Sequence, residues 1–293
     1  MLLLRAMAVL SRRLGRRASR FFLYLIAIYF FLFAPTVRRN SRAYLRRALG
    51  RTPDARDRFR HVLSFATTIH DRVYLANERF DLFEVSIDGE EMMQQLYANG
   101  QGALLLGAHM GSFEIIHCIG RRRPGLRVSM AMYEENARKI NTMLTAISPA
   151  AKPEIIGLGH LDAMLRIRER LDQGVFVGVL GDRTLGHEPA QTVSVLNAPA
   201  RLPVGPMRAA ALLQRSVIFM AGLYRGGNRY HVVFEPLADF STVSAAERPA
   251  AVRDAITRYA ALIEKYCRSD PYSWFNFFDF WRIGGDSPRT RAR

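Results

Sequence analysis

The chain has 293 residues, of which 49% are hydrophobic and 11% aromatic, enough to bury the core of one large α/β domain or two small ones. This composition excludes an intrinsically disordered chain. The formal net charge of +16 lies at the ends: residues 1–60 hold fifteen arginines and two aspartates, residues 282–293 hold four arginines and one aspartate, and residues 61–281 are balanced. A neutral body argues against a nucleic-acid-binding domain, which carries its basic residues on the recognition face.

The two cysteines, Cys118 and Cys267, permit one disulfide at most. No C-x-x-C pair suggests a zinc site or redox chemistry. The sequence therefore predicts a body that faces the cytosol.

Near the N-terminus, an apolar run from Phe21 to Ala34 lies between Arg20 and Arg38. The seventeen residues between these arginines span roughly 25 Å as a helix, against a hydrocarbon core of about 30 Å. Pro35 and the arginines beyond it are unlike the cleavage site of a signal peptide, so we expect the segment to persist.

Six arginines precede this run and six follow it, so the positive-inside rule gives no orientation. A helix or helical hairpin embedded in the cytoplasmic leaflet keeps both clusters on anionic headgroups, and we favour it over a full span. A buried helix of a soluble protein is the remaining alternative. We predict a membrane anchor over residues 1–52, an α/β domain over 53–281 and a basic tail over 282–293.

Helical periodicity next predicts helices from Phe59 to Asn77 and over Glu90–Ala98, followed by a buried strand, Ala103–Leu106, ending at Gly107. Further strands and helices are then predicted in alternation. The strands are Arg127–Tyr133, Glu154–Leu158, Val175–Leu180, Val217–Tyr224 and Tyr230–Glu235, and the helices are Phe113–Gly120, Glu134–Ile147, Leu161–Gln173 and Ala250–Cys267. This order is typical of a mainly parallel sheet flanked by helices, and Gly226-Gly227 predicts that the last two strands form an antiparallel hairpin.

Ligands of open α/β sheets bind beyond the carboxyl ends of the strands. Gly107-Ala108-His109-Met110-Gly111-Ser112-Phe113-Glu114 follows the first predicted strand and has an H-x-x-x-x-E spacing. With His109 in the turn and Glu114 in the first turn of the next helix, the carboxylate can fold back and fix the imidazole tautomer. Such a pair can act as a general base in acyl transfer. A capping histidine beside a surface acid has the same spacing.

Two further places carry polar residues. Asp182 and Arg183 follow the strand Val175–Leu180, where the acid either orients a substrate group or caps a turn. Downstream, residues 201–206 lead into a helix whose first turn suits Pro206 and whose backbone N–H groups can face an anion. Arg201 and Arg208 either add charge there or are solvated beside a rigid turn.

Together these features resemble the bacterial lipid A biosynthesis acyltransferases, the lauroyl and myristoyl transferases of the lysophospholipid acyltransferase superfamily. The matching features are a basic apolar N-terminus, His109 to Glu114, an apolar strand ending in Asp182, and a P-x-G-P block at Pro203–Pro206. The resemblance implies a glycerol-phosphate-acyltransferase-like fold and an acyltransferase at the cytoplasmic face of a bacterial inner membrane.

By this likeness His109 is the general base, Glu114 its orienting partner, and Asp182 a site residue; Arg183, Arg201 and Arg208 are predicted to bind substrate. The acyl group comes from an acyl carrier protein or coenzyme A thioester and goes to a hydroxyl of a membrane lipid, with no metal or redox cofactor. Cys118 is the rival nucleophile, although its apolar helical surroundings favour a small buried residue.

The sequence also departs from the family. Residues 184–190 lack the Gln or Asp that many lipid A enzymes carry there, and seven of the eleven residues 271–281 are aromatic. These aromatics either line an acyl tunnel, contact the bilayer interface or pack the sheet edge. The acceptor is therefore a lipid A precursor, another lipid or a lipid-linked intermediate. A non-catalytic membrane-bound lipid-binding or scaffold protein of the same fold is the main alternative, and nucleic-acid binding through the arginine-rich start is a third.

Overall fold

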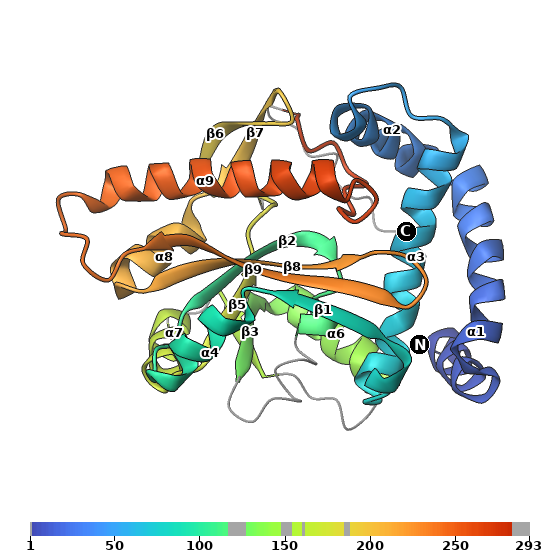
Figure 1. The fold of residues 1–293 in the computed structure, drawn as a ribbon, viewed down its shortest axis with the longest axis horizontal. Helices are drawn as coiled ribbons and strands as arrows, with labels where there is room; N and C mark the ends of the chain where they lie inside the picture. Colours follow the sequence, from blue (N-terminus) through green and yellow to red (C-terminus); the bar gives the residue numbers. More distant parts are fainter. Residues whose placement is uncertain (1, 117–126, 148–153, 160–161, 185–187, 283–293) are drawn as a thin grey trace.

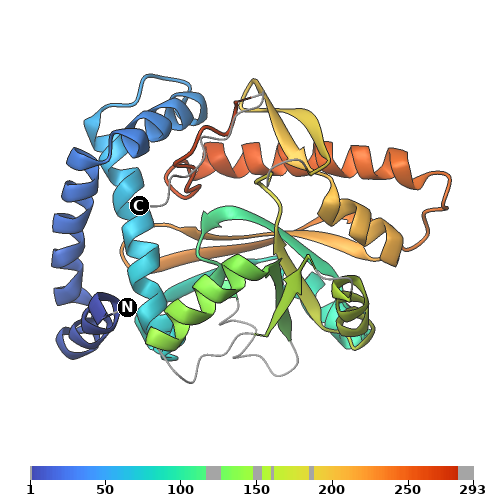
Figure 2. The same ribbon diagram turned by 180° about the vertical axis from the view of Figure 1, so that it is seen from behind.

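The computed structural model describes residues 2–116, 127–147, 154–159, 162–184 and 188–282. Its centre is a seven-stranded sheet of order β1-β9-β8-β2-β5-β3-β4, with helices on both faces (Figures 1 and 2). The strands of this sheet are β1 (Glu84–Asp88), β2 (Leu104–Gly111), β3 (Val128–Tyr133), β4 (Ile155–Leu158), β5 (Phe176–Leu180), β8 (Ser216–Tyr224) and β9 (Arg229–Asp239). The principal helices are α1 (Leu2–Phe33), α2 (Pro35–Leu49), α3 (Ala55–Ala76), α4 (Glu90–Ala98), α6 (Glu134–Ile147), α7 (Ala163–Asp172), α8 (Gly205–Leu213) and α9 (Arg248–Ser269).

The predicted fold class is confirmed for the sheet. Strands β8, β2, β5, β3 and β4 pair in parallel, and β8 and β9 form the predicted antiparallel hairpin. The predicted helix Phe113–Gly120 lies partly outside the described residues. Strand β1, which is mostly exposed and pairs in parallel with β9 at the sheet edge, was not predicted, because its residues show no buried alternation.

A separate two-stranded hairpin, formed by β6 (Ala190–Val195) and β7 (Ala198–Pro203), was also not predicted. Residues 201–203 therefore end a strand, whereas we had predicted only a lead-in to a helix. The helix itself is α8, and Pro206 occupies its first turn as predicted.

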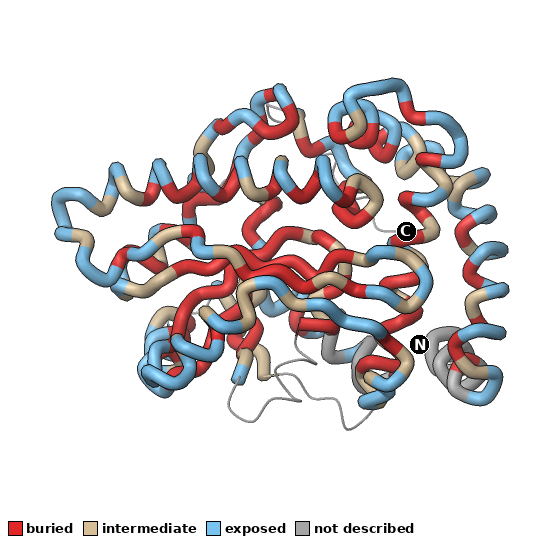
Figure 3. Tube along the Cα trace, in the orientation of Figure 1, coloured by how far each residue is buried: buried red, intermediate tan, exposed pale blue. Residues whose placement is uncertain are grey.

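Both faces of the sheet are covered, as expected for parallel strands joined by crossover helices. On β2, Leu104, Leu106 and Ala108 belong to one core cluster, whereas Leu105 and, just before the strand, Ala103 belong to the other. The first cluster includes residues of α7, α8 and α9, and the second includes residues of α3, α4 and α6. Figure 3 accordingly shows the central strands buried along most of their length.

The sheet forks at its carboxyl edge. Strand β3 pairs with β5 up to Met130 and Gly178. Beyond that point β3 continues along β4 to Tyr133, whereas β5 continues along β2 to Leu180. The carboxyl ends of β3 and β5 therefore diverge, and space opens between them.

Helices α1 and α2 lie at one end of the molecule beside α3 (Figure 1). Helix α1 is interrupted at Gly15, and its part from Arg13 onward meets α2 at 93°. Within the described residues no single helix has the length and hydropathy needed to cross a membrane, although this bent pair passes that test as a unit. The predicted anchor is thus helical and bent, and its contact with a membrane stays a prediction.

The second half of α1 is amphipathic. Leu23 and Ala27 are buried against the body, whereas many large apolar side chains are exposed. The exposed ones are Phe21, Phe22, Tyr24, Leu25, Ile28, Tyr29, Phe30, Leu32 and Phe33. This exposure is unlike a core helix, and it weakens the interpretation of the run as a buried helix of a soluble protein.

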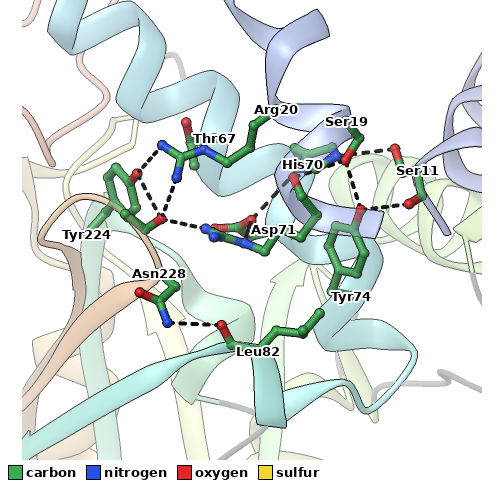
Figure 4. A network of polar contacts seen from close by, with 12 residues as sticks. Ser11, Ser19, Arg20, Thr67, His70, Asp71, Tyr74, Leu82, Tyr224 and Asn228 are labelled. Carbon is green, nitrogen blue, oxygen red and sulfur yellow. Dashed lines mark hydrogen bonds and ion pairs between the residues drawn. The ribbon is translucent and has the colours of Figure 1, made fainter. Parts of the chain in front are cut away.

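The first half of α1 is joined to the body by a buried polar network (Figure 4). The Arg16 guanidinium donates to both carboxylate oxygens of Asp71 on α3, each at 2.8 Å. The Tyr230 hydroxyl of β9 donates to the same carboxylate at 2.8 Å, and Arg16 also donates to the Gly227 carbonyl at 2.7 Å. The N-terminal segment is therefore fixed to α3 and to the β8–β9 hairpin.

Candidate active site

His109 lies in the last part of β2, where the pairing with β8 shifts register between Gly107 and Gly111. The prediction that this strand ends at Gly107 and that His109 lies in a turn is therefore wrong. Gly111 has φ +67° and approaches Gly222 so closely that a Cβ atom would lie 1.8 Å from its carbonyl oxygen. Glycine is therefore required at position 111 to keep the two strands together beyond the irregularity.

The carboxylate that contacts His109 comes from the next strand of the sheet. Asp182, just beyond β5, has its Oδ1 2.7 Å from His109 Nδ1, and its Oδ2 accepts from the His109 backbone N–H at 3.0 Å. A carboxylate only accepts hydrogen bonds, so Nδ1 carries the proton and Nε2 has the lone pair of a base. The Asp182 side chain is 1% exposed and that of His109 is 34% exposed.

Asp182 stays ionised in this setting. Burial alone would raise the pKa of its carboxyl, but the hydrogen bond and electrostatic interaction with the His109 imidazole, the nearby Arg183 charge and a hydrogen bond from Trp274 together hold that pKa well below its usual range. The Trp274 indole Nε1 donates to Oδ2 at 2.9 Å. A permanently charged acceptor orients the imidazole and can stabilise it when it gains a proton.

Glu114 has different partners from those predicted. Its Oε1 lies 2.8 Å from Arg72 Nε of α3, and its Oε2 accepts from the Ser112 hydroxyl at 3.1 Å. The expectation that Glu114 folds back onto the imidazole is therefore corrected, because Asp182 occupies that place. The H-x-x-x-x-E spacing nevertheless brings Glu114 to the same cavity as His109.

A cavity of about 1060 Å³ opens in front of His109 and extends through the fork of the sheet. Four consecutive residues of β3, Met130–Tyr133, and four of β5, Val177–Leu180, line it. Because neighbouring residues of a strand point to opposite faces, this lining means that the cavity passes between the two strands. Most of its wall is apolar, and His109, Arg72, Glu114 and Arg183 are among the polar side chains that line it.

The predicted arginines divide into two groups. Arg183 lines the cavity; its Nη2 donates to the Phe275 carbonyl at 3.4 Å and its guanidinium carbon lies 4.8 Å from the centre of the Phe278 ring. Arg201 and Arg208 are exposed and, among the described residues, are not part of this lining. The P-x-G-P block does reach the site, since Pro203, Gly205 and Pro206 line the cavity.

The C-terminal aromatic segment, residues 271–281, contacts the backbone of β2 at His109 and Gly111. The Phe275 N–H donates to the His109 carbonyl at 2.9 Å, and the Gly111 N–H donates to the Ser273 carbonyl at 2.7 Å. Phe275, Phe277 and Phe278 line the cavity, whereas Trp274 is buried behind it. The density of aromatics marked this segment in the sequence, but no local pattern indicated that an indole would meet Asp182.

The rival nucleophile Cys118 lies outside the described residues. Cys267 is a free, buried thiol whose pKa is raised by burial, so it is not a ready nucleophile. Among the described side chains, no three His, Cys, Asp or Glu residues lie close enough to hold a metal ion. The prediction that the reaction needs no cofactor stays a prediction.

A family model described as bacterial lipid A biosynthesis acyltransferase matches residues 2–283, almost the whole chain. A search of curated proteins found no significant match. The matched range includes the bent helix pair, the His109–Asp182 pair and the aromatic segment.

Proposed function

Because the chain belongs to the bacterial lipid A biosynthesis acyltransferase family, we propose that it transfers a fatty acyl group from a thioester to a hydroxyl of a lipid acceptor. The observation that carries this proposal is the His109–Asp182 pair, whose imidazole lines a large, mostly apolar cavity. Family membership supports an acyltransferase; the thioester donor, the hydroxyl acceptor and the residue roles are our inference.

In the proposed mechanism His109 Nε2 removes the proton from the acceptor hydroxyl as its oxygen attacks the thioester carbonyl carbon. Asp182 stabilises the imidazolium that forms. The carbon–sulfur bond then breaks, the imidazolium returns its proton to the departing thiolate, and an ester and a free thiol remain. Attack is direct, so no acyl-enzyme intermediate forms and no metal or redox cofactor takes part.

The cavity supplies the place for the fatty chain. Apolar side chains of β3, β5 and α7 provide the wall, and methionines 130, 132 and 164 add flexible, polarizable surface that adapts to a chain. Arg183 and Arg72 also line the cavity, and we propose that their charge stabilises the negative charge of a tetrahedral intermediate or of a phosphate-bearing donor or acceptor. A donor is therefore proposed to be an acyl carrier protein or coenzyme A thioester.

On this geometry we assign Asp182 and Arg183 to the site. We assign Glu114 to the cavity wall, where it forms an ion pair with Arg72. Arg201 and Arg208 can contribute only through long-range charge, since both are exposed outside the cavity.

The bent pair α1–α2 is proposed to bind the cytoplasmic leaflet of the bacterial inner membrane. The exposed apolar side chains of α1 suit the acyl region, and the exposed Arg39, Arg42, Arg46 and Arg47 of α2 suit anionic headgroups. Both the acyl chain and a lipid acceptor partition into the bilayer, so an enzyme held there meets both.

The activity is tested by comparing membrane lipids, by mass spectrometry, from cells that express the chain or its His109→Ala variant. We expect a lipid that gains the mass of one fatty acyl unit with the unaltered chain and not with the variant. The mass also identifies the acyl length and the acceptor. Identical lipid profiles with both proteins would favour the non-catalytic lipid-binding alternative.

The membrane contact is tested by replacing Phe21, Tyr29 and Phe33 with serine together, which leaves the Arg16–Asp71 pair intact. Because these side chains are exposed, folding should persist while binding to vesicles of phosphatidylglycerol and phosphatidylethanolamine falls by at least about tenfold. A matched control replaces Leu165 of α7 and Leu212 of α8 with serine, because these side chains are about as exposed as Phe21 and Phe33. Equal loss in both proteins would contradict the proposed anchor.

A further inference from the structure

A continuous hydrogen-bonded path joins helix α2 to the His109–Asp182 pair. From the Ser41 hydroxyl it passes through the His61 imidazole of α3, the Trp274 backbone and indole, and the Asp182 carboxylate to His109. We propose that Trp274 and His61 are positioning residues, which hold Asp182 in the orientation that His109 needs. Through them, that orientation depends on the position of α2 against α3 and Trp274. This inference rests on the proposed function.

The step nearest the reaction is the indole. Asp182 Oδ1 meets the imidazole at 2.7 Å, and its Oδ2 accepts from the His109 backbone N–H at 3.0 Å and from Trp274 Nε1 at 2.9 Å. Without the indole, Oδ2 keeps one of these two donors, so the carboxylate is less restrained about its χ2 axis. Charge-assisted hydrogen bonds of this kind restrain geometry more than neutral ones do.

The same short segment also fixes the backbone of the base. Phe275, next to Trp274, donates its N–H to the His109 carbonyl, and Ser273 accepts from the Gly111 N–H. The segment 273–275 thus contacts His109 through its main chain and Asp182 through a side chain. A displacement of this segment would move both members of the pair.

Trp274 is in turn held by His61. The His61 Nε2 lies 2.8 Å from the Trp274 carbonyl oxygen, and its Nδ1 lies 2.9 Å from the Ser41 hydroxyl. A carbonyl only accepts, so Nε2–H donates to Trp274 and Nδ1 accepts from Ser41. Burial lowers the pKa of His61 to about 4, although its hydrogen bond to the Trp274 carbonyl opposes that shift, so the ring is neutral at physiological pH.

The path is enclosed. Ser41 and His61 are fully buried, and Trp274 and Asp182 are each 1% exposed. Tyr44, also on α2, packs edge-on against the Trp274 ring with 5.2 Å between ring centres. Helix α2 therefore touches Trp274 both through this ring and through the Ser41–His61 hydrogen bonds, which couples the position of α2 to that of the carboxylate.

The test uses Trp274→Phe in the full chain, with Trp281→Phe as a matched control. Trp281 belongs to the same aromatic segment, but its indole donates to the Val195 carbonyl and not to Asp182. We expect Trp274→Phe to lower kcat by about tenfold or more with the KM for an acyl-CoA unchanged, the effect expected when a hydrogen bond to a charged group is lost from the reacting geometry. Trp281→Phe should retain the kcat of the unaltered chain.

A second readout does not depend on turnover. In histidine-labelled full-length protein, the downfield NMR signal of the His109 Nδ1 proton, identified by its loss in His109→Ala, should shift or broaden in Trp274→Phe but not in Trp281→Phe. A chain that transfers no acyl group from any thioester would contradict the proposed function, while this signal would still decide the positioning role. Equal behaviour of the two tryptophan variants in both readouts would overturn the proposal.

Substitutions at His61 keep the test decisive if Trp274→Phe fails to fold. The amide of His61→Gln can still donate to the Trp274 carbonyl, whereas His61→Leu cannot. We expect His61→Gln to retain most of kcat and the His109 signal, and His61→Leu to lose kcat by several-fold with a broadened signal. Equal kcat and equal spectra in the two His61 variants would also overturn the proposal.

Discussion

Two buried aspartates in different parts of the molecule have closely similar hydrogen-bond partners. Asp182 accepts from the His109 imidazole and the Trp274 indole, and Asp71 accepts from the Arg16 guanidinium and the Tyr230 hydroxyl. In each case a cationic or titratable group and a neutral aromatic donor come from distant parts of the chain. Both carboxylates are almost fully enclosed.

The difference lies in the nitrogen partner. Arg16 is 7% exposed and cannot lose its proton, so its pair with Asp71 can only hold α1 against the body. His109 is 34% exposed and lines the cavity, and an imidazole, unlike a guanidinium, can both accept and release a proton. A buried carboxylate therefore fixes a helix at Asp71 and orients a base at Asp182. The two roles differ because, in the part of the chain that the structure describes, the partner of Asp182 has access to the cavity and the partner of Asp71 does not.

The largest effect is expected at Asp182. Asp182→Asn places an amide against His109, which can favour the wrong imidazole tautomer, and we predict a kcat lower by about 10³- to 10⁴-fold. Transfer of a radiolabelled acyl group from acyl-CoA measures it. The corresponding Asp71→Asn chain, assayed below its unfolding temperature, should keep a kcat within about tenfold of the unaltered chain. Equal losses of kcat would erase the distinction between the two aspartates.

At Asp71 the main effect of the substitution should be on stability and not on kcat. Asp71→Asn leaves Arg16 buried without its counter-charge, so we predict a loss of about 3–5 kcal/mol in the free energy of unfolding. Urea denaturation measures this loss, and faster proteolysis within residues 11–20 would report release of α1. Asp81→Asn serves as control, because it breaks an exposed pair with Arg79 worth at most about 1 kcal/mol. A loss no larger than that of the control would contradict the assignment of this pair as a structural link.

The pH dependence of stability tests another buried titratable group, His61 on α3. Its pKa is about 4 in the folded chain, below the ordinary value of 6.5, so the unfolded chain takes up a proton first as pH falls. The free energy of unfolding should therefore fall between about pH 6.5 and pH 4, by up to about 1.4 kcal/mol per unit from this group. Denaturation at stepped pH should show a shallower fall in His61→Gln, and an unchanged slope would show that His61 is not buried as a neutral ring.

A smaller effect is expected at Glu114, where the sequence had placed the partner of His109. If Glu114 acts by holding Arg72 at the cavity, Glu114→Gln and Arg72→Gln should each lower the rate by roughly 10- to 100-fold through misplacement of that group. The double variant should then be no slower than the slower single variant. Fully multiplicative losses would mean that Glu114 acts independently of Arg72.

The sequence allowed the parallel sheet, the β8–β9 hairpin and most helices to be predicted, because hydrophobic periodicity and glycine turns are local signals. The positions of His109, Glu114, Asp182 and Arg183 just after predicted parallel strands also indicated one edge of the sheet for these residues. The sequence assigned the wrong carboxylate to His109, because which side chain meets the imidazole depends on register between β2 and β5, two strands far apart in the chain.

Other features had no local signal at all. The Trp274–Asp182 contact joins residues 92 positions apart, and the Arg16–Asp71 pair joins residues 55 positions apart. Strand β1 lacked buried alternation, and the turn of the β6–β7 hairpin places Leu196 and Asn197 at positive φ, for which leucine gives no indication. Tertiary packing determines such features, and single-sequence periodicity does not encode it.

The most direct test of the account is the rate at which the purified full-length chain, bound to vesicles that contain extracted bacterial lipids, transfers a radiolabelled acyl group from acyl-CoA or acyl carrier protein. With His109→Ala, which leaves the bent pair α1–α2 unaltered, we predict a rate lower by about 10³-fold or more. An unchanged unfolding temperature would confirm that the fold persists. A His109→Ala rate within a few-fold of the unaltered chain would contradict the assignment of His109 as the base.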